Sequence, residues 1–227
     1  MHALASGEGR GPVRQPADPM TLTVEIPMSS RNVLRLAFAA AMALLPTAAL
    51  AHPGFGPAAG FAHGFDHPVS GLDHVLAMVM VGLLACELGG RALWLVPTTF
   101  VLVMAAGGAM GMAGMALPFV EIGIALSVVV LGTVVALGVK APTAVAMAVV
   151  GLFALFHGHA HGTEMPESMG GMTYAAGFLL ATASLHAAGI ALGFLVRGAG
   201  HRYGPVALRS AGGIAAVAGI ALLAGIL

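Results

Sequence analysis

Charged side chains are scarce in this sequence. Only 8% of the 227 residues are Asp, Glu, Lys or Arg, whereas 59% are hydrophobic and the mean hydropathy is +0.96. Because a soluble domain carries about 25% charged residues, this composition excludes an ordinary soluble protein. The formal net charge is zero and no run of basic residues occurs, so nucleic acid is not an expected partner. The composition predicts an integral membrane protein surrounded by a lipid bilayer.

Cysteine is almost absent as well. Cys86 is the single cysteine, which excludes an intramolecular disulfide and a metal cluster held by several cysteines. The sequence also lacks the nucleotide-binding motif Gly-x4-Gly-Lys-Ser/Thr, the metalloprotease motif His-Glu-x2-His and the nucleophile motif Gly-x-Ser-x-Gly. We therefore expect neither ATP hydrolysis by this chain nor an enzymatic activity.

The N-terminal region predicts export rather than a folded domain. Residues 1–27 are polar and rich in proline, and we expect them to be disordered or an artefact of the assigned start codon, with Met28 as the true start. Residues 28–51 have the pattern of a signal peptide: two arginines, a short apolar core and Ala49-Leu50-Ala51, which fits the A-x-A cleavage rule. Cleavage there makes His52 the mature N-terminus. The alternative is an uncleaved first membrane helix, for which a core of about ten apolar residues is short.

The remaining chain, 52–227, contains six apolar segments long enough to cross a bilayer, which takes about 20 residues each. The segments are expected at roughly 68–88, 92–112, 115–138, 142–160, 171–196 and 206–226. The predicted fold is therefore all-α: a polytopic helical bundle of six transmembrane helices, forming one transmembrane domain. Whether the protein forms a homo-oligomer is left open.

The basic residues predict the orientation in the membrane. After the signal peptide only five remain, and all lie in the first, third and fifth connections: Arg91, Lys140, Arg197, Arg202 and Arg209. Under the positive-inside rule these connections are cytoplasmic. We expect a multi-pass protein of the bacterial cytoplasmic (inner) membrane with both mature termini on the periplasmic side.

The first apolar segment begins with ionisable groups. An Asp at the centre of a membrane helix costs about 2.5 to 3.5 kcal/mol, so such groups call for a function. On a helix, His67 and His74 lie two turns apart on one face, with Asp73 beside them, although Pro68 and Gly71 predict an irregular first turn. Imidazole and carboxylate ligands suit Ni²⁺, Co²⁺, Zn²⁺ or Cu²⁺ better than Mg²⁺ or Ca²⁺. The alternative is an ordinary helix start, capped by Ser70 or Asp73, with His67 at the membrane interface.

A second cluster of ionisable groups ends the fourth segment. If the helix continues, His157, His161 and Glu164 lie at i, i+4 and i+7 on one face, and His159 points elsewhere. Histidine-rich tracts are typical of metal binding, and the predicted topology places this one at the outer mouth of the protein. The alternative is a solvated polar loop.

Two isolated groups lie within the third and fifth segments. Glu121 is about two turns from the external end, where it would serve as a metal ligand or proton acceptor, or else touch interfacial water. His186 is deep in the fifth segment, and either a ligand, a proton relay or a hydrogen-bonded core residue is compatible with the pattern. Ser127 is expected only to bond a carbonyl of its own helix.

The motif His67-x5-Asp73-His74 closely resembles that of the HupE/UreJ family of nickel permeases, as do Glu121 in the third helix and His161-x2-Glu164 before the fifth. The resemblance implies a six-helix secondary transporter of Ni²⁺, or Co²⁺, with the ion as substrate and no permanently bound cofactor. It also implies delivery of the metal to enzymes such as hydrogenase or urease.

The expected site has eight residues, which the ion meets in three stages: capture at His157, His161 and Glu164, partial dehydration at His67, Asp73, His74 and Glu121, and release past His186. A permease for copper or zinc, a membrane metalloenzyme and a non-transporting metal-binding accessory protein remain as alternatives.

Overall fold

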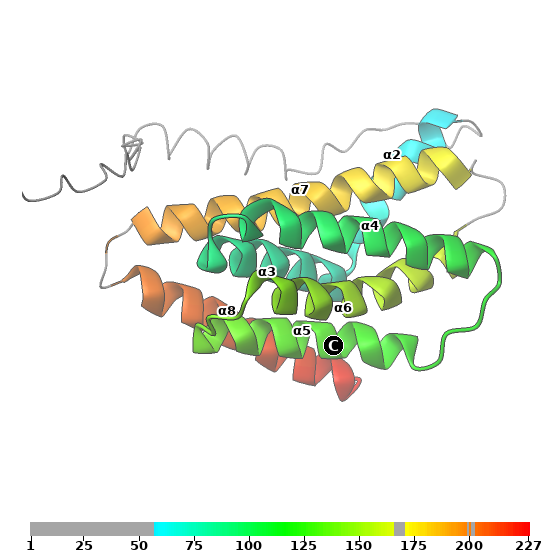
Figure 1. Cartoon of the computed structure of the whole chain (residues 1–227). Coiled ribbons are helices and arrows are strands. Elements are labelled where there is room, and N and C mark those ends of the chain that lie inside the picture. Colours follow the sequence, from blue (N-terminus) through cyan, green and yellow to red (C-terminus); the bar gives the residue numbers. More distant parts are fainter. Residues whose placement is uncertain (1–56, 166–170, 199, 201–202) are drawn as a thin grey trace, which may run out of the picture.

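The structure is a computed structural model that describes residues 57–165, 171–198, 200 and 203–227. The predicted disordered segment, the signal peptide and His52 lie outside the described residues. Within the described ranges all regular structure is helical (Figure 1). The helices are α2 (Pro57–Ser70), α3 (Leu72–Leu88), α4 (Ala92–Met112), α5 (Val120–Leu137), α6 (Thr143–Thr163), α7 (Gly171–Gly198) and α8 (Gly204–Leu223).

Helices α4 to α8 are each long and apolar enough to cross a membrane. The pair α2 and α3 meets the same test together, but it is bent by 81° where the two helices join. Counting the bent pair as one span gives up to six spans, which confirms the predicted polytopic membrane fold. The predicted segment 92–112 coincides with α4, and the bounds of α5 to α8 differ from their predictions by a few residues.

The first span is the one that departs most from its prediction of a helix over 68–88. Gly71 adopts an extended backbone, with φ −87° and ψ 119°, and therefore interrupts the helical hydrogen bonding. Pro68 belongs to the last turn of α2, on the other side of the break. The expected irregularity is thus an 81° bend between two helices, and α3 begins only at Leu72.

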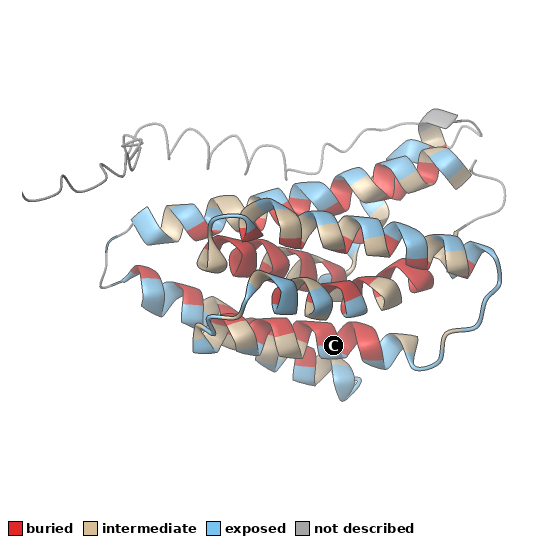
Figure 2. Cartoon of the chain, viewed as in Figure 1, coloured by how far each residue is buried: buried red, intermediate tan, exposed pale blue. Residues whose placement is uncertain are grey.

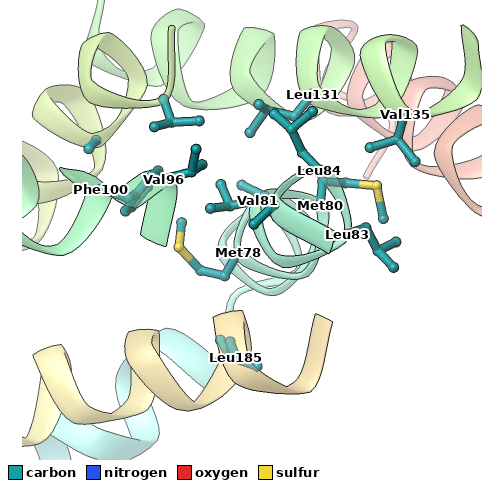
Figure 3. Packing of buried hydrophobic residues seen from close by; sticks show 14 of the residues in the cluster. Met78, Met80, Val81, Leu83, Leu84, Val96, Phe100, Leu131, Val135 and Leu185 are labelled. Carbon is teal, nitrogen blue, oxygen red and sulfur yellow. The ribbon is translucent and has the colours of Figure 1, made fainter. Parts of the chain in front are cut away.

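Helix α3 lies inside the bundle and contacts every other described helix (Figure 2). Its Met78, Val81 and Leu83 side chains are fully buried. In Figure 3 they lie among Phe100 of α4 and Leu185 of α7, together with residues of α5. Large apolar side chains on the outer helices remain exposed, among them Leu102, Leu152 and Ile214. Such exposure is expected where helices face lipid rather than water.

Helices α4 and α6 approach each other closely enough that glycine is required at their contact. A Cβ atom at Gly158 would overlap the backbone carbonyl of Met104, and one at Gly162 would overlap the carbonyl of Gly108. Small residues that allow such backbone contact are typical of membrane helix pairs. The contact fixes the depth of His157 and His161, which lie on either side of Gly158.

Replacing Gly158 by alanine is expected to destabilise the protein by about 1–3 kcal/mol, because the added methyl group has backbone rather than a movable side chain in its way. Gly151→Ala is the matched control: Gly151 is buried in the same helix, but a Cβ there would meet only side-chain methyl groups at 3.5 and 3.7 Å. Thermal unfolding in detergent measures both variants. Equal melting temperatures for the two would contradict the packing described here.

Candidate metal-ion site

Histidine and glutamate side chains from α2, α3 and α6 gather into two adjacent groups that share His161. The outer group consists of His67, His161 and Glu164, and the inner group of His74, His157 and His161. Within each group the potential ligand atoms all lie within 4.8 Å of one another. Three ligands at such spacing are enough to hold a transition-metal ion and leave positions for water.

The outer group is partly open to water. The Nε2 atom of His67 lies 3.3 Å from a carboxylate oxygen of Glu164, and the Nδ1 atom of His161 lies 3.6 Å from the same oxygen. The side chains of Glu164, His67 and His161 are 54%, 31% and 16% exposed. An arriving hydrated cation can therefore exchange some of its water for a carboxylate and two imidazoles here.

The inner group is buried. His74 is 1% exposed and His157 is 0% exposed. The His74 ring centre lies 5.2 Å from that of His157 and 5.1 Å from that of His161, and the Phe178 ring packs against both His74 and His161. Among the described residues the group contains imidazoles alone. It offers a dry, uncharged set of nitrogen ligands just beyond the outer group.

Each imidazole of the inner group has a nitrogen without a hydrogen bond. The Nδ1 atoms of His74, His157 and His161 are buried and have no hydrogen-bond partner within the described part of the chain. A buried polar atom left in this way costs about 1–3 kcal/mol, so it usually has a function. The Nδ1 atom of His159 is unpaired in the same way, but among the described imidazoles only the three of the inner group also have ring nitrogens within 4.8 Å of one another, a spacing at which they can share a metal ion.

His186 belongs to neither group. It is 1% exposed, and neither of its ring nitrogens has a hydrogen-bond partner among the described residues. Its ring centre lies 5.2 Å from that of Phe100, which in turn lies 5.8 Å from that of His157. Phe100 thus contacts the rings of both His157 and His186, so His186 lies apart from the inner group, on the other side of this ring contact; its role in metal binding stays a prediction.

Two predicted ligands, Asp73 and Glu121, belong to neither group. The carboxylate of Asp73 accepts a 2.7 Å hydrogen bond from the backbone N–H of His74, in the first turn of α3. Glu121 is exposed in the first turn of α5. Metal binding by Asp73 and Glu121 therefore stays a prediction from the sequence.

Two predictions about the arrangement were wrong. His67 and His74 do not share a face of one helix, because the helix changes direction between them; each instead reaches His161, with ring-centre distances of 4.9 and 5.1 Å. His157 is not at the mouth, since the last turns of α6 run inward from Glu164 and bury it completely. His159 points away from both groups and donates from Nε2 to the Met115 carbonyl at 2.6 Å.

Two hydroxyl residues bond the inner imidazoles: Ser127 was expected to bond only a carbonyl of its own helix, and Thr182 was not singled out from the sequence. Ser127 lies 2.9 Å from Nε2 of His157, and Thr182 lies 3.2 Å from Nε2 of His74. Both are fully buried. A hydroxyl group deep in an apolar helix was the signal that could have indicated a buried hydrogen bond. The helix that supplies its partner could not be identified from the sequence.

Comparisons with known proteins identify relatives of the chain. The family described as HupE / UreJ protein matches residues 40–222. Protein HupE of Rhizobium leguminosarum bv. viciae is 54% identical over 181 residues, which cover 80% of this chain and 93% of that protein. No solved structure matches the chain.

Proposed function

Because the chain belongs to the HupE/UreJ family, which comprises transport and accessory proteins rather than enzymes, we propose that it is a secondary permease importing a divalent transition-metal ion. Ni²⁺ is the proposed substrate, with Co²⁺ next, for delivery to metalloenzymes such as hydrogenase or urease. The observation that carries the proposal is the pair of ligand groups sharing His161, one open to water and one buried.

A shared ligand allows an ion to be passed on without being released. While an ion moves from the outer to the inner group, His161 can stay bound as His67 and Glu164 are replaced by His74 and His157. Each exchange then replaces one ligand at a time, which avoids a bare dication in a poorly solvating interior. In this exchange the ion leaves behind the single carboxylate ligand of the two groups and becomes bound by imidazoles alone.

The basic residues lie away from the ligand groups, at the other end of α3. Lys140 donates to the carbonyl of Glu87 at 3.1 Å, and Arg197 donates to the carbonyl of Cys86 at 2.8 Å, whereas His74 is in the first turn of this helix. With the positive-inside rule this supports the proposed orientation in the inner membrane, with the ligand groups toward the periplasm. An inward-negative potential then contributes about 4.6 kcal/mol per 100 mV for a dication.

Uptake into liposomes tests the proposal. Purified protein reconstituted with a metal-sensitive dye in the lumen, under an inside-negative potential, is expected to fill the vesicles with Ni²⁺. Competition by Co²⁺, Zn²⁺ and Cu²⁺ then ranks the substrates. Binding of Ni²⁺ without any luminal signal would instead identify a metal-binding accessory protein.

A further inference from the structure

The hydrogen bonds of Ser127 determine which nitrogen of His157 carries a proton. The Ser127 hydroxyl oxygen lies 2.6 Å from the Ile124 carbonyl oxygen and 2.9 Å from Nε2 of His157. A hydroxyl has one proton, and a carbonyl can only accept, so that proton is donated to Ile124. The serine oxygen must then accept from His157, which places the imidazole proton on Nε2 and the lone pair on Nδ1.

Thr182 stands in the same relation to His74. Its hydroxyl oxygen lies 3.2 Å from Nε2 of His74 and 3.8 Å from the sulfur of Met104. When the threonine hydroxyl donates to the Met104 sulfur, its oxygen accepts from Nε2 of His74. In that arrangement His74 also keeps its lone pair on Nδ1.

We infer that Ser127 and Thr182 are positioning residues that fix His157 and His74 as Nε2–H imidazoles, so that each presents Nδ1 to the transported metal ion. The inference rests on the proposed function and adds how the imidazoles of the inner group are oriented for metal binding. Those Nδ1 atoms are the ones left buried without a partner. Hydrogen bonds behind a ligating histidine commonly set its tautomer and ring orientation in this way.

The close contact of α5 and α6 holds the serine in register with its histidine. Gly123 lies one turn before Ser127, and Phe156 directly precedes His157. A Cβ atom at Gly123 would lie 2.6 Å from the Phe156 ring, so the two helices can meet here only because that residue is glycine. The distance between hydroxyl and imidazole is thus set by helix packing rather than by a mobile loop.

His186 provides the contrast inside the same protein. Neither of its nitrogens has a hydrogen-bond partner in the described ranges, so no hydroxyl selects its tautomer. Either ring nitrogen of His186 is therefore free to bind an ion, which suits a transient contact without a fixed ligand geometry. The hydroxyl groups that orient His74 and His157 therefore distinguish the inner group from His186.

The direct test is ¹⁵N NMR of the full-length, metal-free protein in detergent, with labelled histidine and with His74→Gln and His157→Gln variants to assign the signals. Both imidazoles are expected to show protonated Nε2 and unprotonated Nδ1. Protonated Nδ1 on either residue overturns the inference. Because no metal is present, this result is independent of whether the protein transports Ni²⁺.

Loss of the hydroxyl supplies the second test. Ser127→Ala is expected to mix the two tautomers of His157 and to weaken Ni²⁺ binding about 10- to 100-fold, whereas Ser127→Thr, which keeps a hydroxyl, should bind nearly as the parent does. Ser184→Ala is the control, since that exposed hydroxyl donates to the Leu180 carbonyl and has no other hydrogen-bond partner among the described residues. An unchanged His157 spectrum in Ser127→Ala also overturns the inference. Failure of the parent protein to fill liposomes, with the NMR result as expected, would refute the transport proposal alone.

Discussion

Replacing His161 by alanine is expected to reduce the initial rate of Ni²⁺ uptake by more than about 100-fold. His161 is the one side chain that belongs to both ligand groups, so its loss leaves two ligands in each and removes the connection between them. Changes to residues that merely support a metal ligand already cost about 10- to 100-fold, and loss of a shared ligand must exceed that range. Uptake into dye-loaded liposomes at matched protein content provides the measurement.

His159→Ala is the matched control for that experiment. His159 lies two residues away on the same helix and is even less exposed, but it bonds the Met115 carbonyl and belongs to neither group. We expect the His159 variant to retain most of the parental rate. A larger loss with His159→Ala than with His161→Ala would show that the ligand groups are wrongly assigned.

The two groups are expected to control different kinetic parameters. Glu164→Gln keeps the shape of the side chain but removes its negative charge, so capture weakens and the half-saturating metal concentration rises, on the order of 10- to 100-fold. The maximal rate should change little, since Glu164 is absent from the inner group. His74→Ala, which removes an inner ligand, should instead lower the maximal rate by at least a similar factor.

Initial rates across a range of Ni²⁺ concentrations separate these effects. If Glu164→Gln lowered only the maximal rate, or if His74→Ala raised only the half-saturating concentration, the order of outer and inner groups would have to be reversed. The control for protein amount is the quantity of each variant recovered from the liposomes.

The spans were predictable because each is a long apolar run ended by glycine, proline or charge. The helix over 92–112 was predicted to the residue, since hydropathy alone sets its length. The bend at Gly71 was only partly predictable. Pro68 and Gly71 indicate irregular backbone, but the sequence does not say whether a helix resumes in its former direction.

The ligand groups were predictable as residue types but not as partners. Ionisable groups in apolar helices stand out in any sequence. Which residues form the outer group and which the inner group depends on how the end of α6 packs beside the bend between α2 and α3. That packing cannot be read from the sequence. Ser127 illustrates the limit: its bond to a helix carbonyl was expected and is present, whereas its second bond, to His157, depends on the neighbour of α5.

The bend at Gly71 also leaves α3 short. Its 17 residues span roughly 26 Å, less than the hydrocarbon thickness of about 30 Å, whereas the 28 residues of α7 span roughly 42 Å. A bilayer around such unequal helices must thin locally, or long helices must tilt, to relieve the hydrophobic mismatch. For the proposed cargo the consequence is a shorter insulating layer, because the partly exposed outer group adjoins His74 at the start of α3.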